Sequence, residues 1–361
     1  MRYKLRTSLA LTCVALAGIL MAGCGKEEPA PGGTSTPVAT PAATGPITIG
    51  YSDWPGWTCW DIAEKQGFFK KEGVDVKLVW FANYTDSLNA FAAKQVDANC
   101  QTWGDTMGPL AAGQDAKVVI VNDNSAGNDA MVAKAGINSV KDLKGKTVAT
   151  ELGTVDHFLM LKALEANGMK ESDVKYVNIK VQDCPAAMIG GKIDACVVWE
   201  PNKSQLLDKM KGAHVIFDSK SIPGLIPDLL VFQGPVVASR KADVQKIVNA
   251  WYDTMAWWRA NPDEAVKIMA ARTGSPVTFY KGFIMGTRIF DGPEALGAFT
   301  KSTKVTSLYT SGQSVAEFLV AAKQIPKVPD FESALDMSFT KAAVDAGLGK
   351  QPPYDYKLKV D

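Results

Sequence analysis

Short apolar runs alternate with amphipathic stretches along the chain from about residue 46 onward. Strand-like runs stand at 47–51 (ITIGY), 74–81 (VDVKLVWF), 96–100 (VDANC) and 117–121 (KVVIV), with helix-like stretches at 60–71 and 87–94. Strand and helix patterns that alternate at this spacing are typical of βαβ units with a mostly parallel sheet. The pattern therefore predicts an α/β lobe in the first part of the chain.

A second series of the same kind starts at residue 144. It consists of KTVAT, a helix-like stretch at 157–167, VKYVNIKV at 174–181, a short helix at 185–190 and DACVVWE at 194–200. This series predicts a second α/β lobe. Two extended segments, DAMVAKA at 129–135 and LLVFQGPVVASR at 229–240, look like strands that pass between the lobes, and two such crossings imply a hinge.

The pattern becomes helical after Arg240. Apolar residues recur there at helical spacing, and Asn261-Pro262-Asp263-Glu264 supplies a cap, a first-turn proline and acidic residues at the start of a further helix. We expect this helical region to return to the first lobe. The predicted boundaries are residues 46–134 with 236–361 for lobe 1 and residues 135–235 for lobe 2.

The N-terminal segment, residues 1–23, has the layout of a secretory signal peptide, with basic residues followed by an apolar run too short to remain as a membrane span. The run ends in LMAGC at 20–24, which resembles the bacterial lipobox, where the cysteine receives a diacylglycerol group before cleavage. We therefore expect Cys24 to be lipidated; the alternative is an ordinary signal peptide followed by a chance cysteine. Residues 24–45 are rich in Pro, Gly, Ser, Thr and Ala, and this composition predicts a flexible linker.

Charge is nearly balanced over the whole chain, with 39 Lys and Arg residues against 38 Asp and Glu residues and no basic cluster outside the signal segment. A nucleic-acid partner would need such a cluster to neutralise its phosphates. The composition therefore argues against nucleic-acid binding.

Cysteines outside the signal segment and Cys24 form a set of four: Cys59, Cys100, Cys184 and Cys196. Outside the cytoplasm an even set can form disulfides, and local pairing suggests Cys59 with Cys100 and Cys184 with Cys196. The alternative is that all four are small buried apolar side chains. None has the CxxC spacing of a zinc or redox site, and we expect neither a metal nor a cofactor.

Five segments, taken in their order and spacing, carry a family resemblance. They are IAEKQGFFKKEGVDV at 62–76, KQVDANCQT at 94–102, DLKGKTVATELGT at 142–154, GGKIDACVVWEP at 190–201 and NPDEAV at 261–266. The chain resembles the nitrate/taurine/aliphatic-sulfonate family of ABC solute-binding proteins, which includes the NMT1/THI5-like binders of thiamine pyrimidine. This resemblance implies the type II periplasmic binding fold, in which two α/β lobes joined by two crossing hinge strands hold a ligand in the cleft between them.

The function implied by the resemblance is that of an extracytoplasmic solute-binding lipoprotein serving an ABC importer. Its partners would be the ABC transporter permease, a small-molecule ligand and the membrane reached through lipidated Cys24, at the periplasm or the extracellular face. We expect it to act as a monomer. Two alternatives are an NMT1/THI5-like enzyme of thiamine-pyrimidine synthesis, whose cysteine-rich motif the sequence lacks, and a tethered ligand sensor.

Candidate ligand residues follow the carboxyl ends of the expected strands, where ligands bind in open α/β sheets. The candidates are Asp53, Trp54, Trp57, Thr102, Trp103, Asp105, Asn124 and Asp129 from the first lobe, and Gly153, Thr154, Asp156, Asp183, Trp199 and Glu200 from the second. The alternative for each loop tryptophan is packing in its own loop. Asp156 and Asp183 have the alternative of capping the helices that follow them.

The chemistry of these candidates departs from that of an anion site. They include several carboxylates but no Lys or Arg, and Val155 stands where family members often have a second hydroxyl residue after Gly-Thr. Such a lining does not suit a free sulfonate or nitrate. Aromatic faces beside carboxylates suit an amine-bearing or cationic ligand, and a stacked pyrimidine also fits. The sequence therefore predicts an aromatic, carboxylate-rich cleft.

Overall fold

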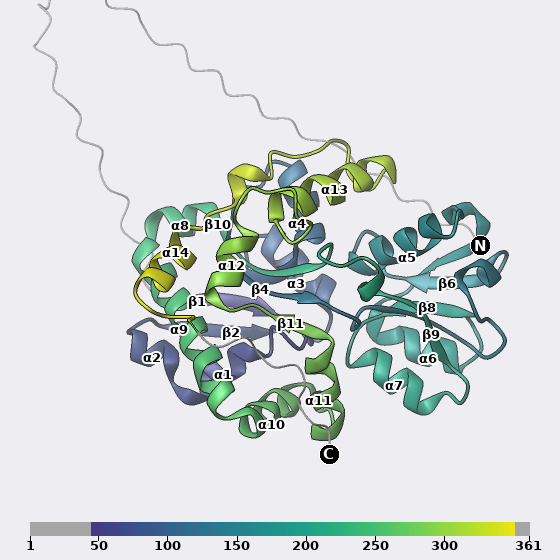
Figure 1. Cartoon of the computed structure of the whole chain (residues 1–361), viewed down its shortest axis with the longest axis horizontal. Helices are drawn as coiled ribbons and strands as arrows, with labels where there is room; N and C mark the ends of the chain where they lie inside the picture. The colour runs from purple at the N-terminus through teal and green to yellow at the C-terminus, as the bar shows by residue number, and fades with distance from the viewer. Residues whose placement is uncertain (1–44, 351–361) are drawn as a thin grey trace, which may run out of the picture. The chain divides into compact units, whose positions relative to one another are not determined.

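The computed structural model describes residues 45–350 of the chain (Figure 1). The predicted signal peptide, the lipidation site Cys24 and nearly all of the predicted linker lie outside the described residues. Within the described part, no helix combines the length and the apolar character that crossing a bilayer requires.

Lobe 1 is built on a sheet with the strand order β11-β4-β10-β3-β1-β2. Its strands are β1 (Ile47–Tyr51), β2 (Val76–Trp80), β3 (Ala98–Thr102), β4 (Ala116–Ser125), β10 (Pro227–Gln233) and β11 (Thr287–Ile289). β1, β2 and β3 pair in parallel, whereas β10 runs antiparallel to both β3 and β4. The central strands β3, β4 and β10 are almost fully buried. Residues 118–121 of β4 and 229–232 of β10 are accordingly continuous apolar runs, whereas β3 and the end of β4 bury polar side chains.

Helices of lobe 1 come from both ends of the described chain. They are α1 (Cys59–Gln66), α2 (Phe68–Glu72), α3 (Tyr84–Ala92), α4 (Trp103–Ala111), α8 (Gly234–Ser239), α9 (Lys241–Ala260), α10 (Pro262–Thr273), α11 (Val277–Met285), α12 (Gly292–Ala298), α13 (Leu308–Ala321) and α14 (Ser338–Asp345). α9 packs against α1 and α2 (Figure 1), and the rings of Trp251 and Trp60 meet at 4.8 Å. The helical C-terminal region therefore packs on lobe 1.

Lobe 2 is built on a sheet with the strand order β7-β6-β8-β5-β9. Its elements are β5 (Ala130–Ala133), β6 (Thr147–Thr150), α5 (Val155–Ala166), β7 (Lys175–Asn178), α6 (Cys184–Ile189), β8 (Ala195–Val198), α7 (Asn202–Lys209) and β9 (His214–Asp218). β6 pairs in parallel with β7 and β8, and β5 is antiparallel to β8. Short 3-10 helices at Val140–Leu143, Glu171–Asp173, Val181–Asp183, Ser219–Ser221 and Glu332–Ala334 complete the described elements.

The crossings between the lobes lie earlier than the boundaries drawn from the sequence. β5 belongs to the sheet of lobe 2 and β10 to the sheet of lobe 1, so the chain crosses between β4 and β5 and again between β9 and β10. The sequence boundaries at 134/135 and 235/236 assigned β5 to lobe 1 and β10 to lobe 2. A short apolar run gives no sign of which sheet it joins, and both segments are fully buried interior strands.

All four cysteines of the described residues are buried free thiols: Cys59, Cys100, Cys184 and Cys196. The suggested disulfides Cys59 with Cys100 and Cys184 with Cys196 are not formed. Cys59 Sγ lies 3.8 Å from Met269 Sδ and Cys196 Sγ lies 3.7 Å from Met188 Sδ. These thiols therefore act as small apolar side chains of the core, as the alternative interpretation has it.

Candidate ligand-binding site

A small cavity lies between the lobes, and residues of both lobes line it. The lining residues are Trp54, Trp57, Tyr84, Thr102, Asp129, Val155, Trp199, Ile226 and Asp228. Several follow the carboxyl end of a strand, since Trp54 comes after β1, Thr102 ends β3 and Trp199 comes after β8. The space enclosed between these side chains is small. In the described form it therefore has room for about one water molecule.

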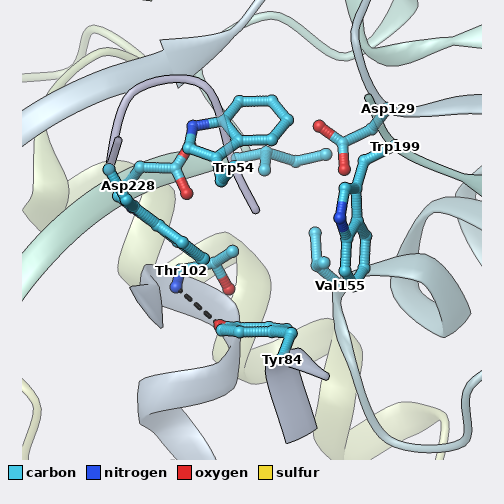
Figure 2. A pocket seen from close by; sticks show the side chains of 9 residues that line it. Trp54, Tyr84, Thr102, Asp129, Val155, Trp199 and Asp228 are labelled. Carbon is cyan, nitrogen blue, oxygen red and sulfur yellow. Dashed lines mark hydrogen bonds between the residues drawn. The ribbon is translucent and has the colours of Figure 1, made fainter. Parts of the chain in front are cut away.

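Four aromatic rings form much of the cavity wall. The ring of Trp57 lies 6.3 Å from that of Trp54 and 5.1 Å from that of Tyr84, measured between centroids. Trp199 meets Tyr84 edge to face at 5.6 Å. Figure 2 shows Trp54, Tyr84 and Trp199 on three sides of the cavity. One ring of lobe 2 is thus brought against rings of lobe 1.

The polar ends of two of these rings are engaged by the surrounding protein. The indole N–H of Trp54 donates to Asp123 Oδ1 at 2.9 Å. The Tyr84 hydroxyl donates to Asp105 Oδ2 at 2.8 Å and accepts from the Thr102 N–H at 3.0 Å (Figure 2). These bonds fix the two rings and use their donors, so a bound molecule would meet the apolar part of each ring.

Asp53 joins the two lobes directly. Its Oδ1 accepts from Trp199 Nε1 at 3.0 Å, and its Oδ2 accepts from Asn202 Nδ2 at 3.3 Å. Burial raises the pKa of Asp53 to about 6, and the hydrogen bonds from Trp199 and Asn202 oppose that rise. The lining of the cavity does not include Asp53. Its side chain instead holds Trp199 and the start of α7 against lobe 1.

Asp129 and Asp228 are the acids of the cavity lining. Each residue is 2% exposed. Asp129 Oδ2 has no hydrogen-bond partner among the described residues, whereas the Asp228 carboxyl group hydrogen-bonds with that of Asp123. Figure 2 shows the Asp129 carboxyl group directed toward Trp54. Burial raises the pKa of Asp129 to about 6, while a hydrogen bond from Ser125 and the nearby charge of Lys203 lower it. Asp129 is therefore largely ionised at neutral pH.

Asp228 is coupled to Asp123, the acceptor of the Trp54 indole. Burial raises the pKa of both carboxyl groups, to about 7 for Asp123 and well above its usual range for Asp228. The charge of Asp123 raises the pKa of Asp228 further, whereas the hydrogen bonds from Asp228 and Trp54 lower that of Asp123. The proton of this pair therefore resides on Asp228, and Asp129 supplies the negative charge of the cavity.

A neighbouring cavity contains three further residues predicted from the sequence: Asp105, Gly153 and Thr154. It shares Thr102, Val155 and Ile226 with the first cavity. Asp105 binds the Thr102 hydroxyl at 2.9 Å, and burial raises its pKa to about 7.

Asp156 is fully buried near the start of α5, with both carboxyl oxygens lacking a hydrogen-bond partner, and neither cavity lining includes it. Burial raises the pKa of Asp156 well above its usual range, and the charge of Asp129 raises it further. The alternative in which its side chain caps α5 has no hydrogen bond to support it.

Two predicted residues of lobe 1 lie away from both cavities. Trp103 is fully buried in the core, where its Nε1 donates to the carbonyl of Leu308 at 3.0 Å and its ring meets Phe331 edge to face. Trp103 therefore packs in the protein core and does not contact the ligand site, which is the alternative considered from the sequence. Asn124 lies on β4 opposite Arg288 of β11 and outside the lining of either cavity.

Two predicted residues of lobe 2 also lie elsewhere. Asp183 is exposed and makes no side-chain capping bond at the start of α6. Glu200 accepts from the Ser204 N–H and hydroxyl, each at 3.0 Å, and pairs with Lys203 at 2.8 Å. Its carboxylate therefore stabilises the start of α7 and does not face the cavity.

Sequence reasoning missed Tyr84, Val155, Ile226 and Asp228 as lining residues. Asp228 is the second residue of β10, and an antiparallel strand brings its first residues to the edge where the parallel strands end. The signal available in the sequence was an acidic residue at the start of an otherwise apolar run. Tyr84 begins α3 and carries no such signal.

Neither cavity is lined by Lys or Arg. Lys203 is the basic group that lowers the pKa of Asp129, but its Nζ is bound to Glu200 and to the carbonyl of Gly127 at 2.9 Å. Among the described residues, no group of three His, Cys, Asp or Glu side chains is arranged to hold a metal ion. The site is thus acidic and aromatic, with its nearest cation committed to the protein.

Comparison with known proteins identifies the relatives of this chain. The family model described as NMT1/THI5 like matches residues 54–265. The taurine-binding periplasmic protein of Escherichia coli is 24% identical over 274 residues, which is 72% of this chain and 82% of the relative.

Solved structures show the same fold. The periplasmic aliphatic sulphonate binding protein SsuA of Escherichia coli matches with a TM-score of 0.67 at 21% identity, over 81% of this chain and 97% of that one. The desulfurization enzyme DSZB matches with a TM-score of 0.59 at 16% identity, over 83% of this chain and 99% of that one, in its complex with biphenyl-2-sulfinic acid. These likenesses confirm the two-lobed periplasmic binding fold expected from the sequence.

Proposed function

Because the chain belongs to the NMT1/THI5-like family, we propose that it is the solute-binding component of an ABC importer and acts outside the cytoplasm. The observation that carries the proposal is a cavity with walls from both lobes, closed by the hydrogen bonds of Asp53 to Trp199 and Asn202. A solute that contacts both lobes favours the closed form, because its contacts are complete only in that form. The permease then receives the solute from the closed protein.

The solute class that the lining supports is an amine-bearing or otherwise cationic small molecule. Aromatic rings and an ionised Asp129 suit a cation, and no Lys or Arg lines the cavity to hold a sulfonate or nitrate. A stacked pyrimidine is compatible with the rings alone. The relative named for taurine is a precedent for a solute that carries both an amine and a sulfonate.

Membrane attachment through lipidated Cys24 and a monomeric state complete the proposal. Both rest on the sequence, since Cys24 lies outside the described residues. A lipid anchor followed by a flexible linker would let the two lobes reach a permease in the same membrane.

An enzyme of thiamine-pyrimidine synthesis is the second candidate, because the family name includes THI5 and DSZB shares the fold. A cysteine nucleophile would have to be a thiolate. Burial raises the pKa of the thiols of Cys59 and Cys100 above the ordinary value, and the neighbouring thiol of Cys196, together with burial, does the same for Cys184. These thiols therefore do not favour the enzyme.

The test is mass spectrometry of small molecules released from the purified, denatured protein, followed by calorimetry with amines, pyrimidines, taurine and nitrate. A released solute that rebinds stoichiometrically and is returned unchanged supports the proposal. Chemical turnover of the bound compound would move the assignment to an enzyme.

A further inference from the structure

Resting on the proposed solute-binding function, we propose that the group enclosed by the cavity is a protonated amine that donates an N–H bond to Asp129. This assignment narrows the solute class: it excludes a quaternary ammonium, a neutral ring and a sulfonate from the enclosed position. Asp129 supplies both the negative charge and the hydrogen-bond acceptor.

An unpaired acceptor is the first observation. Asp129 Oδ2 is buried, lacks a hydrogen-bond partner among the described residues, and belongs to a residue that lines the cavity. A buried acceptor without a donor costs free energy, so the native complex is expected to supply a donor at this atom. A protonated amine carries several N–H donors on one atom, whereas a quaternary ammonium carries none.

Three of the four ring donors in the lining are already used, and the fourth, the Trp57 indole N–H, has no partner among the described residues. The Trp54 indole is bound to Asp123, the Trp199 indole to Asp53 and the Tyr84 hydroxyl to Asp105. The rings are left to interact through their π faces, which attract a cation.

Charge favours a cation over a neutral donor. Asp129 is ionised at neutral pH, and Lys203 is the basic group whose charge lowers its pKa. Lys203 is itself bound to Glu200 and to the Gly127 carbonyl. Asp105, Asp156 and Asp228 surround the same region, and the charge of Asp129 acts on each of them. A ligand cation would supply the balancing charge that the described residues do not provide.

Size distinguishes among cations. The described cavity has room for about one water-sized group. An ammonium head is close to water in size, so it fits with little change in the wall. A trimethylammonium head is several times larger and would force the rings apart.

Four probes with one chain and different heads test the assignment on the wild-type protein: n-propylammonium, n-propyltrimethylammonium, 1-propanol and 1-propanesulfonate. Tryptophan fluorescence and calorimetry at pH 7.5 give their affinities. We expect n-propylammonium to bind at least about tenfold more tightly than each of the others. Equal or tighter binding of any other probe overturns the proposal.

Variants identify the acid involved. Asp129→Asn keeps the shape of the side chain and removes its charge, so n-propylammonium should bind about 10- to 100-fold more weakly. Asp183→Asn is the matched control, because Asp183 is exposed and outside both cavities. Circular dichroism and the thermal midpoint establish that both variants are folded. A folded Asp129→Asn protein with unchanged affinity for n-propylammonium overturns the proposal.

The released natural solute separates failure of this inference from failure of the proposed function. If none of the four probes binds, a released solute with a protonated amine supports the assignment, and one without it overturns the assignment while keeping the solute-binding function. A protein that binds no probe and releases no solute removes both proposals.

Discussion

The carboxylate of Asp53 in lobe 1 accepts a 3.0 Å hydrogen bond from the indole N–H of Trp199 in lobe 2. Trp199 also lines the cavity. Closing the lobes and completing the aromatic wall are therefore the same structural event.

Replacing Asp53 by alanine should weaken solute binding about tenfold. The substitution leaves the Trp199 donor unpaired in the closed form, and an unpaired buried donor costs about 1–3 kcal/mol. Calorimetry with the released solute measures the affinity, and small-angle X-ray scattering measures lobe closure in its presence. Asp183→Ala is the control at an exposed acid. An unchanged affinity in Asp53→Ala would show that the bond has no part in closure.

The ligand-free protein should become less stable as the pH rises from about 4 to 7. The pKa values of Asp53, Asp105 and Asp129 are raised from 3.8 to about 6, about 7 and about 6, respectively, mainly by burial. Between 3.8 and these values the folded protein holds protons that the unfolded chain has lost, so its free energy of unfolding falls as the pH rises. A rise from 3.8 to about 6 corresponds to at most about 3 kcal/mol per group.

Thermal midpoints at pH 4.5, 6.0 and 7.5 test this pH dependence. Asp129→Asn should flatten the curve, because the amide does not titrate. Burial lowers the pKa of His157, so this single group makes the free energy of unfolding rise with pH. A midpoint that rises steadily from pH 4.5 to 7.5 would contradict the expected stabilisation by the protonated acids.

Trp57 and Trp103 should respond differently to replacement by phenylalanine. Trp57 lines the cavity and its buried indole N–H has no partner, so Trp57→Phe should reduce affinity for a cationic solute about 3- to 10-fold with little loss of stability. Trp103 donates to Leu308 in the core, so Trp103→Phe should cost about 1–3 kcal/mol of stability and leave affinity unchanged. Calorimetry and denaturant titration separate the two effects. The reverse pattern would place Trp103 at the site.

Cys59, Cys100, Cys184 and Cys196 should all react with iodoacetamide after unfolding without a reductant, because all four are free thiols. In the folded protein they should react slowly, since they are buried. Intact mass spectrometry counts the labels on protein purified from its native compartment. Two labels in place of four would indicate that one of the two disulfides considered from the sequence is formed.

Replacing Cys24 by serine should release the protein from the membrane fraction without changing its solute affinity, since the lipid would be attached only at that residue. Fractionation with immunodetection and calorimetry measure the two properties. Continued membrane association of Cys24→Ser would argue against the lipobox interpretation.

The elements of the fold could be predicted from the sequence because each carries its own periodicity. The apolar runs that become β1, β2 and β3, and the buried stripe of α9, are local patterns. The sheet to which β5 or β10 belongs is decided by partners distant in the sequence, and no local pattern records it.

The candidate site, too, could be predicted only as far as local sequence patterns reach. Trp54, Thr102 and Trp199 line the cavity because they end or follow strands, which the sequence indicates directly. Trp103 and Asp183 occupy equivalent places in the chain, yet one is buried in the core and the other is exposed. The direction of each side chain depends on its position in the helical turn, and the hydrophobic pattern of the sequence does not predict the orientation of a single side chain.

The small volume of the cavity also has a kinetic consequence. With room for about one water molecule, the cavity of the described form is too small to hold a larger solute. Exchange must therefore pass through an open form, and the dissociation rate cannot exceed the rate at which the lobes separate. The lifetime of the complex is then set by the breaking of interlobe bonds such as Asp53 to Trp199, and a permease that lowers this barrier would control when the solute is delivered.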